Sequence, residues 1–380
     1  MSGRSKVRAV CVAGVRPNFV KAAPLLRALR ARDLFDARLV HTGQHQDPNL
    51  SSAFWRDLAM PPPDVHLQVR SGSHARQTAD IMNALDPVLD DLQPQVVVVV
   101  GDVNSTLAGA LVAAKLVLRA PFRTRFGERR RPLLVHVEAG LRSFDPDMPE
   151  EINRRVTDAL ADLLYVTEPA GMANLAREGI PADRAVLVGN VMIDSMRAAR
   201  DLAGGPAILG QLELAGPYGV VTLHRPGNVD EPATLRRLID VLDRLSREMP
   251  LVFPVHPRTA ARLRELAVSL KPPGWRVIEP LGHSAFLRLL GGARVVFTDS
   301  GGVQDETAVL GVPCLTLRPG TERPITVDNG TNQVVGTAPE AIEAGFRRAL
   351  ATQPRATVPP LWDGRAAERI ADHLASVLTA

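Results

Sequence analysis

The 380-residue chain has little of several features that mark other classes of protein. It contains two cysteines, Cys11 and Cys314, which lie far apart in apolar stretches, so we expect buried reduced thiols rather than a disulfide or a metal site. No apolar run approaches the roughly 18 residues that cross a bilayer, and no apolar signal segment follows the N-terminus. These absences predict a cytoplasmic protein with no membrane segment.

Aromatic residues make up 4% of the chain, and the formal net charge is only +4. The stretch 121–132, PFRTRFGERRRP, contains five arginines and one glutamate, so the charges of the remaining residues sum to zero. A nucleic-acid-binding protein needs a basic face with interleaved aromatics, and we therefore predict no nucleic-acid partner. We interpret the basic stretch as a solvated surface insertion, with an anion-binding or subunit-contact role as the alternative.

The chain also lacks the short motifs of the common cofactors. It has no HExxH or CxxC pair for a metal, and no Walker A or GxGxxG sequence for ATP or NAD. We therefore predict that the protein needs neither a metal nor a cofactor.

What the chain does contain is a regular alternation of short apolar runs and helical patterns, which is typical of parallel sheets with crossover helices. The run VVVVV at 96–100 is apolar throughout, which predicts a central strand buried on both faces. Two such series follow each other along the sequence. We predict two Rossmann-like, doubly wound α/β domains facing a cleft, the first formed by residues 1–190 with the returning helix in 363–380, the second by residues 191–362.

The segment 295–306, VVFTDSGGVQDE, is an apolar run that stops at a Ser-Gly-Gly turn and restarts as a helical pattern. Backbone N–H groups at a helix start can hold a phosphate, and Gly301 and Gly302 let a ligand oxygen approach them closely. Ser300 adds a hydroxyl, and Glu306, further along the helix, can accept hydrogen bonds from a ribose. The segment predicts a nucleotide pocket; a tight turn that only caps a helix is the alternative.

Carboxylates follow strand ends in the first half of the chain. Asp102 follows VVVVV, Glu138 follows an expected strand at 133–136, and Glu150 lies downstream in MPEEINR. Because the carboxyl ends of parallel strands share one edge of a sheet, we expect these acids at one ligand site. Neighbouring carboxylates raise one another's proton affinity, which suits an acid and a base. Helix capping, by Asp102 or by Glu150 and Glu151, is the alternative.

Basic side chains complete the pattern. Arg16 and Lys21 flank the turn after the first strand, where two cations suit an anionic ligand. In the second half, His224 follows a strand in VTLHRPGN and is placed to stabilise charge on a departing diphosphate. His256 follows the next strand in FPVHPRT, and we interpret it as a turn histidine with local hydrogen bonds.

The ordered set of motifs resembles that of the non-hydrolysing UDP-N-acetylglucosamine 2-epimerases over residues 9–336. The motifs are GxRPxxxK, HTGQHxD, GDxxST, HVEAGLRS with MPEEINR, GN, HR, and DSGGxQxE followed by RPGTERPITVDNGTN. The resemblance implies two Rossmann-like domains in the arrangement of glycosyltransferase-B enzymes, a homodimer, and interconversion of UDP-GlcNAc and UDP-ManNAc. It also implies a route through elimination of UDP to 2-acetamidoglucal and its re-addition, with no redox cofactor.

Motif matching assigns roles to individual residues. The catalytic carboxylates of the family match Asp102, Glu138 and Glu150, and its diphosphate-stabilising histidine matches His224. Its UDP-binding positions match Arg16, Ser300, Gly301, Gly302 and Glu306, and Lys21 matches a cation of the first loop. The sequence departs from the family where glutamates are usual, at Asn18, Gly227 and Asp305, which affects fine specificity more than the reaction. The loop QHQD at 44–47 leaves regulation by a second UDP-GlcNAc open.

Three alternatives remain open from the sequence. A hydrolysing epimerase would release UDP and free ManNAc from the same kind of pocket. A glycosyltransferase of the same architecture would need an acceptor site, and the acid-rich region between HVEAGLR and PEEINR disfavours it. A non-catalytic nucleotide-sugar sensor has no use for the three carboxylates. Which carboxylate takes the C2 proton is not decided by the sequence.

Overall fold

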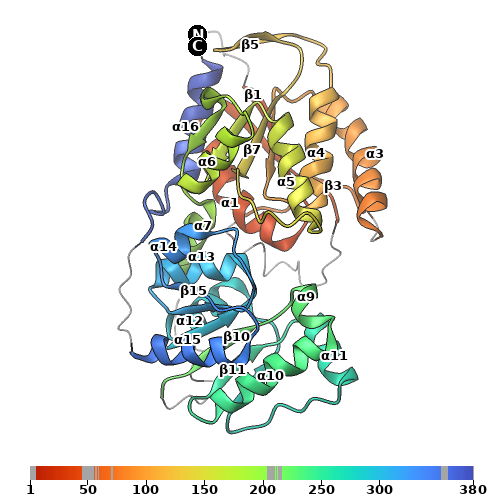
Figure 1. Cartoon of the computed structure of the whole chain (residues 1–380). Coiled ribbons are helices and arrows are strands. Elements are labelled where there is room, and N and C mark those ends of the chain that lie inside the picture. Colours follow the sequence, from red (N-terminus) through yellow and green to blue (C-terminus); the bar gives the residue numbers. More distant parts are fainter. Residues whose placement is uncertain are drawn as a thin grey trace. The chain divides into compact units, whose positions relative to one another are not determined.

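The computed structural model describes residues 6–44, 55, 58, 60–69, 72–202, 210, 212, 216–351 and 358–379 (Figure 1). The chain forms two compact units, unit 1 with residues 1–195 and 361–380, and unit 2 with residues 196–360. In the part of the chain that is described, no helix is both long and apolar enough to cross a bilayer.

Unit 1 is built on a seven-stranded parallel sheet in the order β3-β2-β1-β4-β7-β8-β9. The strands are β1 (Val7–Ala13), β2 (Phe35–His41), β3 (Val65–His66), β4 (Val96–Val100), β7 (Leu133–Ala139), β8 (Leu163–Val166) and β9 (Ala185–Leu187). The predicted central strand is confirmed, because β4 has three strands on either side. Its valines alternate between two cores, with Val96, Val98 and Val100 in one and Val97 and Val99 in the other.

Helices cover both faces of this sheet (Figure 1). They are α1 (Arg16–Arg30), α3 (His74–Leu92), α4 (Asn104–Lys115), α5 (Pro149–Leu160), α6 (Pro169–Arg177) and α16 (Ala366–Leu378), and α7 (Val191–Leu202) leads out of the unit. Helices α1 and α16 pack side by side over one core, while α3 and α4 cover the other. The C-terminal helix is therefore part of unit 1.

Unit 2 repeats the plan with a six-stranded parallel sheet in the order β12-β11-β10-β13-β14-β15. The strands are β10 (Gly219–Thr222), β11 (Leu251–Pro254), β12 (Trp275–Ile278), β13 (Val295–Thr298), β14 (Cys314–Thr316) and β15 (Asn332–Val334). The helices are α9 (Pro226–Val229), α10 (Pro232–Ser246), α11 (Pro257–Glu265), α12 (His283–Gly291), α13 (Gly301–Leu310), α14 (Pro324–Asp328) and α15 (Pro339–Ala351). Helices α10 and α15 cover one face, and α12 and α13 the other.

The basic stretch at 121–132 forms an antiparallel hairpin of β5 (Phe122–Thr124) and β6 (Gly127–Arg129). Most of its arginines are exposed in the single chain, as expected for a surface segment. Arg129 bonds Asp162 at 2.8 Å, and the backbone N–H of Arg125 donates to the carbonyl of Val377 in α16. The hairpin is thus fixed to unit 1 both at its turn and at the end of β6.

The two cysteines are buried, Cys11 in β1 and Cys314 in β14, as expected from their apolar surroundings. Burial raises the pKa of each thiol to about 12, so both stay protonated at neutral pH. Such thiols are poor nucleophiles, and they serve here as small core side chains.

In each sheet, the order in which the chain adds strands reverses at one point. The loops beside this point are where a ligand site can form. In the order of unit 1 the chain runs outwards from β1 to β3 and then resumes at β4 on the other side of β1. In unit 2 the same change occurs between β10 and β13. Loops at the carboxyl ends of two such strands separate to opposite faces and leave a crevice, which is where ligands bind in sheets of this type.

In unit 1 the loops at this point touch closely at Gly14. A Cβ atom added there would lie 1.9 Å from the Ser105 Oγ and 2.4 Å from the Thr42 Oγ1. These two hydroxyls are hydrogen-bonded at 2.8 Å, and the Ser105 Oγ also bonds the Gln44 Oε1 at 2.6 Å. Only glycine lets the three loops after β1, β2 and β4 meet.

We predict that Gly14→Ala destabilises unit 1 by about 1–3 kcal/mol, the usual cost of forcing extra atoms into a packed site. Thermal and urea unfolding would measure the change. Gly72→Ala is the matched control in the same unit, because a Cβ there meets only the Arg76 side chain at ordinary contact distances of 3.6 Å and above. Equal stability of the two variants would contradict this account of the loop contact.

Candidate functional site

Glu138 lies at the carboxyl end of β7 in a strained backbone conformation. Its φ is +73°, in the left-handed region, and the register of β7 against β8 shifts at this residue. Such a conformation costs a non-glycine residue on the order of 1–3 kcal/mol and is concentrated at functional sites. The side chain is 4% exposed and forms an ion pair with the Lys21 Nζ of α1. In this backbone conformation the carboxylate of Glu138 contacts the buried ammonium group of Lys21 at the end of the strand.

Asp102 follows β4 across Gly101, whose φ is +69°. Its carboxylate receives two hydrogen bonds from Arg154 of α5, from Nε at 3.0 Å and from Nη2 at 2.6 Å. The cap of α4 is Val103 and has no side-chain hydrogen bond, so Asp102 does not cap that helix. A Cβ on Gly101 would lie 3.5 Å from the Glu138 Oε2. The turn that carries Asp102 is therefore directly beside the Glu138 carboxylate.

The two adjacent glutamates of α5 differ in their surroundings. Glu151 is buried and accepts hydrogen bonds from the Ser143 N–H at 2.8 Å and from the Arg154 Nη1 at 2.8 Å. Burial alone would raise the pKa of Glu151, but these two partners hold that pKa below its ordinary value. Glu151 thus anchors the loop before the helix. Glu150 is partly exposed in the first turn and makes no such anchor.

The loop after β1 supplies further polar groups. Arg16 is the first residue of α1 and is partly exposed, while Lys21 is 9% exposed and bound to Glu138. Asn18, which stands where a glutamate is usual, accepts from the Gly14 N–H and donates to the Val100 carbonyl at 3.0 Å. The amide therefore ties the end of β1 to the end of β4, a role that needs a donor as well as an acceptor.

In unit 2, His224 follows β10 and faces Asp299, which follows β13. The His224 Nδ1 lies 3.0 Å from the Asp299 Oδ1, and Asp299 also accepts from the backbone N–H groups of His224 and Arg225. Asp299 is fully buried, and burial alone would raise its pKa, but the hydrogen bonds and charge of His224 lower it. The His224 side chain is 38% exposed, so one buried acid orients an accessible imidazole.

The Ser-Gly-Gly turn begins α13 as predicted. Ser300 is the N-cap residue, but its side chain makes no capping bond, and Gly301 and Gly302 form the first turn of the helix, partly exposed. A Cβ on Gly301 would lie 3.6 Å from the Nε of Arg323, which places a cation beside these N–H groups. A helix N-terminus of this kind favours an anion.

Glu306 lies in the second turn of α13 and is 4% exposed. Its Oε1 is 3.1 Å from the Nε2 of His283, while its Oε2 is buried and has no hydrogen-bond partner among the residues that the structure describes. The neighbouring Asp305, another departure from the family, pairs with Arg323 at 3.0 Å. Gly227, the third departure, has open space where a side chain would be. The free oxygen of Glu306 is suited to accept a hydrogen bond from a ligand hydroxyl.

Sequence reasoning missed three residues that hold these groups in place. Arg154 pairs with Asp102, Asp299 orients His224, and His283 contacts Glu306. Arg154 and Asp299 lie within motifs that were recognised, whereas His283 lies outside them, and nothing in the sequence says which partner each one has. His256, in contrast, accepts from the Arg258 N–H at 3.2 Å as a helix cap, which confirms it as a turn histidine. Residues 45–47 of the QHQD loop lie outside the described residues.

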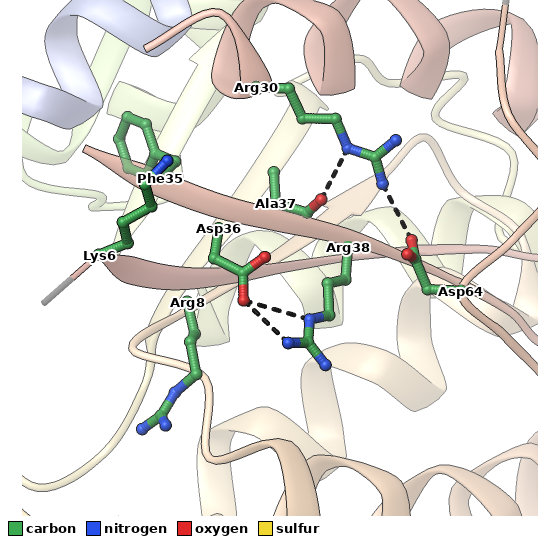
Figure 2. A pocket seen from close by; sticks show the side chains of 8 residues that line it. All are labelled: Lys6, Arg8, Arg30, Phe35, Asp36, Ala37, Arg38 and Asp64. Carbon is green, nitrogen blue, oxygen red and sulfur yellow. Dashed lines mark hydrogen bonds and ion pairs between the residues drawn. The ribbon is translucent and has the colours of Figure 1, made fainter. Parts of the chain in front are cut away.

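A hollow of about 740 Å³ lies elsewhere in unit 1, near the beginnings of β1 and β2 (Figure 2). Its lining consists of Lys6, Arg8, Arg30, Phe35, Asp36, Ala37, Arg38 and Asp64. Two of its arginines are already paired, Arg38 with Asp36 and Arg30 with Asp64, each at 3.0 Å. It contains none of the groups at the carboxyl ends of the strands, so we do not assign the chemistry to it.

Two Rossmann-like units, one with acids at its switch point and the other with an oriented histidine and a helix N-terminus, are typical of α/β enzymes that bind ligands at the carboxyl ends of parallel strands. Residues 27–375 match the sequence model of the UDP-N-acetylglucosamine 2-epimerase family. The chain belongs to this family, and it is an isomerase of the epimerase type.

Individual relatives cover nearly the whole chain. The UDP-N-acetylglucosamine 2-epimerase of Methanocaldococcus jannaschii is 36% identical, over 94% of this chain and 96% of the relative. The UDP-2,3-diacetamido-2,3-dideoxy-D-glucuronate 2-epimerase of Pseudomonas aeruginosa is also 36% identical, over 98% and 100%. A crystal structure of the M. jannaschii UDP-GlcNAc 2-epimerase in complex with UDP-GlcNAc and UDP matches with a TM-score of 0.87 and 35% identity, over 97% and 99%.

The lowered pKa of Asp299 predicts how unit 2 responds to acid. The carboxylate contributes stability fully above its ordinary pKa of about 3.9 and loses it as the pH falls towards the lower folded value. Asp299→Asn should therefore lose less stability than the wild type as the pH falls below about 4. At pH 7 the variant should be less stable than the wild type by about 1–3 kcal/mol, because the hydrogen-bond partners of Asp299 are left unsatisfied.

Urea unfolding of the wild type and the variant between pH 3 and 7 measures both effects. The exposed Asp240 of α10 provides the control variant Asp240→Asn. Parallel stability curves for wild type and Asp299→Asn would show that the ion pair with His224 does not carry the stabilisation.

Proposed function

We propose that the protein is a non-hydrolysing UDP-N-acetylglucosamine 2-epimerase that interconverts UDP-GlcNAc and UDP-ManNAc. The C2–H and C1–O bonds of the sugar break, the C2 proton passes to a carboxylate, and the C1–O electron pair leaves with UDP. The product of this step is 2-acetamidoglucal, with a double bond between C1 and C2. Re-addition of UDP, with a proton delivered to the other face of C2, gives the epimer without any net redox change.

The acids of unit 1 are the proposed proton-transfer groups. Asp102 and Glu138 are each held by a cation, Arg154 and Lys21, and the carboxylate is the form in which such a side chain acts as a base. Glu150 is partly exposed and is the third proposed acid. Lys21, which we expected at the ligand, is bound to Glu138, and we propose that it acts on the substrate chiefly through that carboxylate.

The polar groups of unit 2 are proposed to hold UDP. Ser300, Gly301 and Gly302 offer a hydroxyl and helix N–H groups to the diphosphate, and Glu306 offers its free oxygen to the ribose. His224, oriented by Asp299, is proposed to stabilise the charge that develops on the leaving diphosphate. We propose Arg16 as a further contact of the anionic diphosphate of UDP.

The observation that carries this proposal is the pairing of both central acids, Asp102 and Glu138, with cations at the switch point of unit 1. A sensor of nucleotide sugars has no need of acids arranged in this way, and a glycosyltransferase needs a binding site for a second sugar or acceptor. Membership of the epimerase family supports the same reaction class.

One other substrate is favoured by a specific observation. The P. aeruginosa relative that acts on a UDP-2,3-diacetamido-glucuronate is as similar in sequence as the M. jannaschii relative. Because both reactions invert C2 of a UDP-linked 2-acetamido sugar, the same acids serve either one. Both sugars therefore belong in the assay. We also propose that the enzyme works in the cytoplasm as a homodimer, which light scattering would show as twice the 41.0 kDa of one chain.

Incubation of the protein with UDP-GlcNAc in deuterated water, followed by proton NMR, tests the reaction. We expect UDP-ManNAc to appear with deuterium at C2, because the carboxylate exchanges its proton with solvent before re-addition. Free ManNAc with UDP would identify the hydrolysing alternative. Protium retained at C2 would contradict proton abstraction by these acids, and turnover of the diacetamido-glucuronate alone would correct the substrate.

We predict that Asp102→Asn and Glu138→Gln each lower kcat by about 10²–10⁴-fold, the range of a lost acid or base. Binding of UDP, measured by calorimetry, should remain, because the proposed UDP contacts lie largely in unit 2. Glu128→Gln, in the exposed β5–β6 hairpin, is the control. Near-normal turnover by either acid variant would remove that residue from the mechanism.

A further inference from the structure

Two residues before Glu138, the strand β7 carries a histidine that the proposed reaction does not use. His136 is fully buried. Its Nδ1 lies 2.6 Å from the Oδ1 of Asp158 in α5, and its Nε2 lies 2.8 Å from the carbonyl oxygen of Gly101. Both ring nitrogens are therefore at hydrogen-bond distance from an oxygen.

The chemistry of these two oxygens fixes the protonation of the ring. A peptide carbonyl can only accept a hydrogen bond, and an ionised carboxylate can only accept one as well. A neutral imidazole has a single N–H, so one of its nitrogens would direct a lone pair at an oxygen lone pair in a buried site. Only the imidazolium form of His136 satisfies both contacts.

The charges around the ring support this assignment. Besides the imidazole of His136, Asp158 accepts from the Gly140 N–H at 3.1 Å and pairs with Arg142 at 2.7 Å. Arg142 also donates two hydrogen bonds to Glu178, at 2.8 and 2.6 Å. With His136 charged, two cations, His136 and Arg142, face two carboxylates, the buried Asp158 and the more exposed Glu178, and these four charges sum to zero.

The environment of Asp158 agrees with a charged neighbour. Burial alone would raise the pKa of Asp158, but the charge and hydrogen bond of His136, together with Arg142, lower it. An acid that is fully buried and yet stays ionised needs such cationic partners.

The contacts of this cluster lie next to the proposed catalytic acids. Gly101 directly precedes Asp102, has a positive φ, and donates its own N–H to the Val137 carbonyl at 3.0 Å. Gly140 follows Glu138 by two residues, and its N–H is held by Asp158. The pair of His136 and Asp158 therefore fixes the backbone on one side of Asp102 and on both sides of Glu138.

We propose that His136 is a positioning residue that stays in the imidazolium form and keeps Asp102 and Glu138 in the positions that proton transfer requires. It touches no substrate itself. The proposal rests on the proposed function, because those two acids are the groups that it positions. A misplacement of about 1 Å at such groups can reduce a rate on the order of 10²-fold.

The protonation state is tested first, without any assay of turnover. Nitrogen-15 spectra of the full-length protein labelled at histidine distinguish a ring with two N–H groups from a ring with one, and loss of a signal in His136→Gln assigns it. We expect two N–H groups on His136 at pH 7 and 8. A single N–H would overturn the proposal, whether or not the enzyme epimerises UDP-GlcNAc.

The positioning role is tested by separating kcat from KM. The amide in His136→Gln carries no charge and has both of its N–H donors on one nitrogen, so it does not reproduce the two contacts of the ring. We therefore expect kcat to fall by about 10²-fold while KM and the affinity for UDP stay close to wild type. His373→Gln, at a partly buried histidine on α16 that bonds Tyr165, is the matched control and should retain wild-type turnover. Wild-type kcat in His136→Gln would overturn the positioning role.

A second variant covers the case in which His136→Gln does not fold. Asp158→Asn keeps the ring and its contact with Gly101 but removes the counter-charge, so kcat should fall and KM should again change little. Unchanged kcat in Asp158→Asn would equally overturn the role. If the proposed function itself is wrong, the wild-type protein will epimerise neither sugar, and this result is distinct from the effects of the two variants.

Discussion

The structure depends on carboxylates that lie near the carboxyl ends of the strands of unit 1 and are each paired with a cation. Glu138 is paired with Lys21, Asp102 with Arg154, and the fully buried Asp158 with His136. An unpaired charge in such a place would cost several kcal/mol or would be neutralised by protonation. The pairings allow unit 1 to concentrate carboxylates where the parallel sheet opens, and these carboxylates are the basis of the proposed chemistry.

Backbone geometry supplies the second constraint. The strand order of each unit reverses at one switch point, between β1 and β4 in unit 1 and between β10 and β13 in unit 2, and the loops after such strands are where ligands bind in sheets of this type. Fitting polar groups into these points requires unusual backbone: glycine at 14, where three loops meet, and positive φ at Gly101 and Glu138. Glu138 combines this backbone conformation with the ion pair to Lys21, so electrostatics and backbone strain meet at the same residue.

The sequence predicts the parts of this design that follow from local patterns. The VVVVV run could be placed at the centre of a parallel sheet because valines that face two cores leave no polar side, and Ser-Gly-Gly after a strand could be placed at the start of α13. The expected strand at 133–136 ends too early, since β7 runs through the strained Glu138. The partners Arg154 and Asp299 could not be predicted, because they are separated from their acid or histidine by about 50 and 75 residues and only the packed sheets bring them together.

The most direct test of the account is a crystal structure of Asp102→Asn with UDP-GlcNAc bound, since this variant should bind the substrate without consuming it. The account predicts that the diphosphate lies at the N-terminal turn of α13 and that C2 of the sugar lies within hydrogen-bond reach of the substituted side chain at position 102 or of the Glu138 carboxylate. A sugar bound away from both of these side chains, with the diphosphate elsewhere than α13, would contradict it.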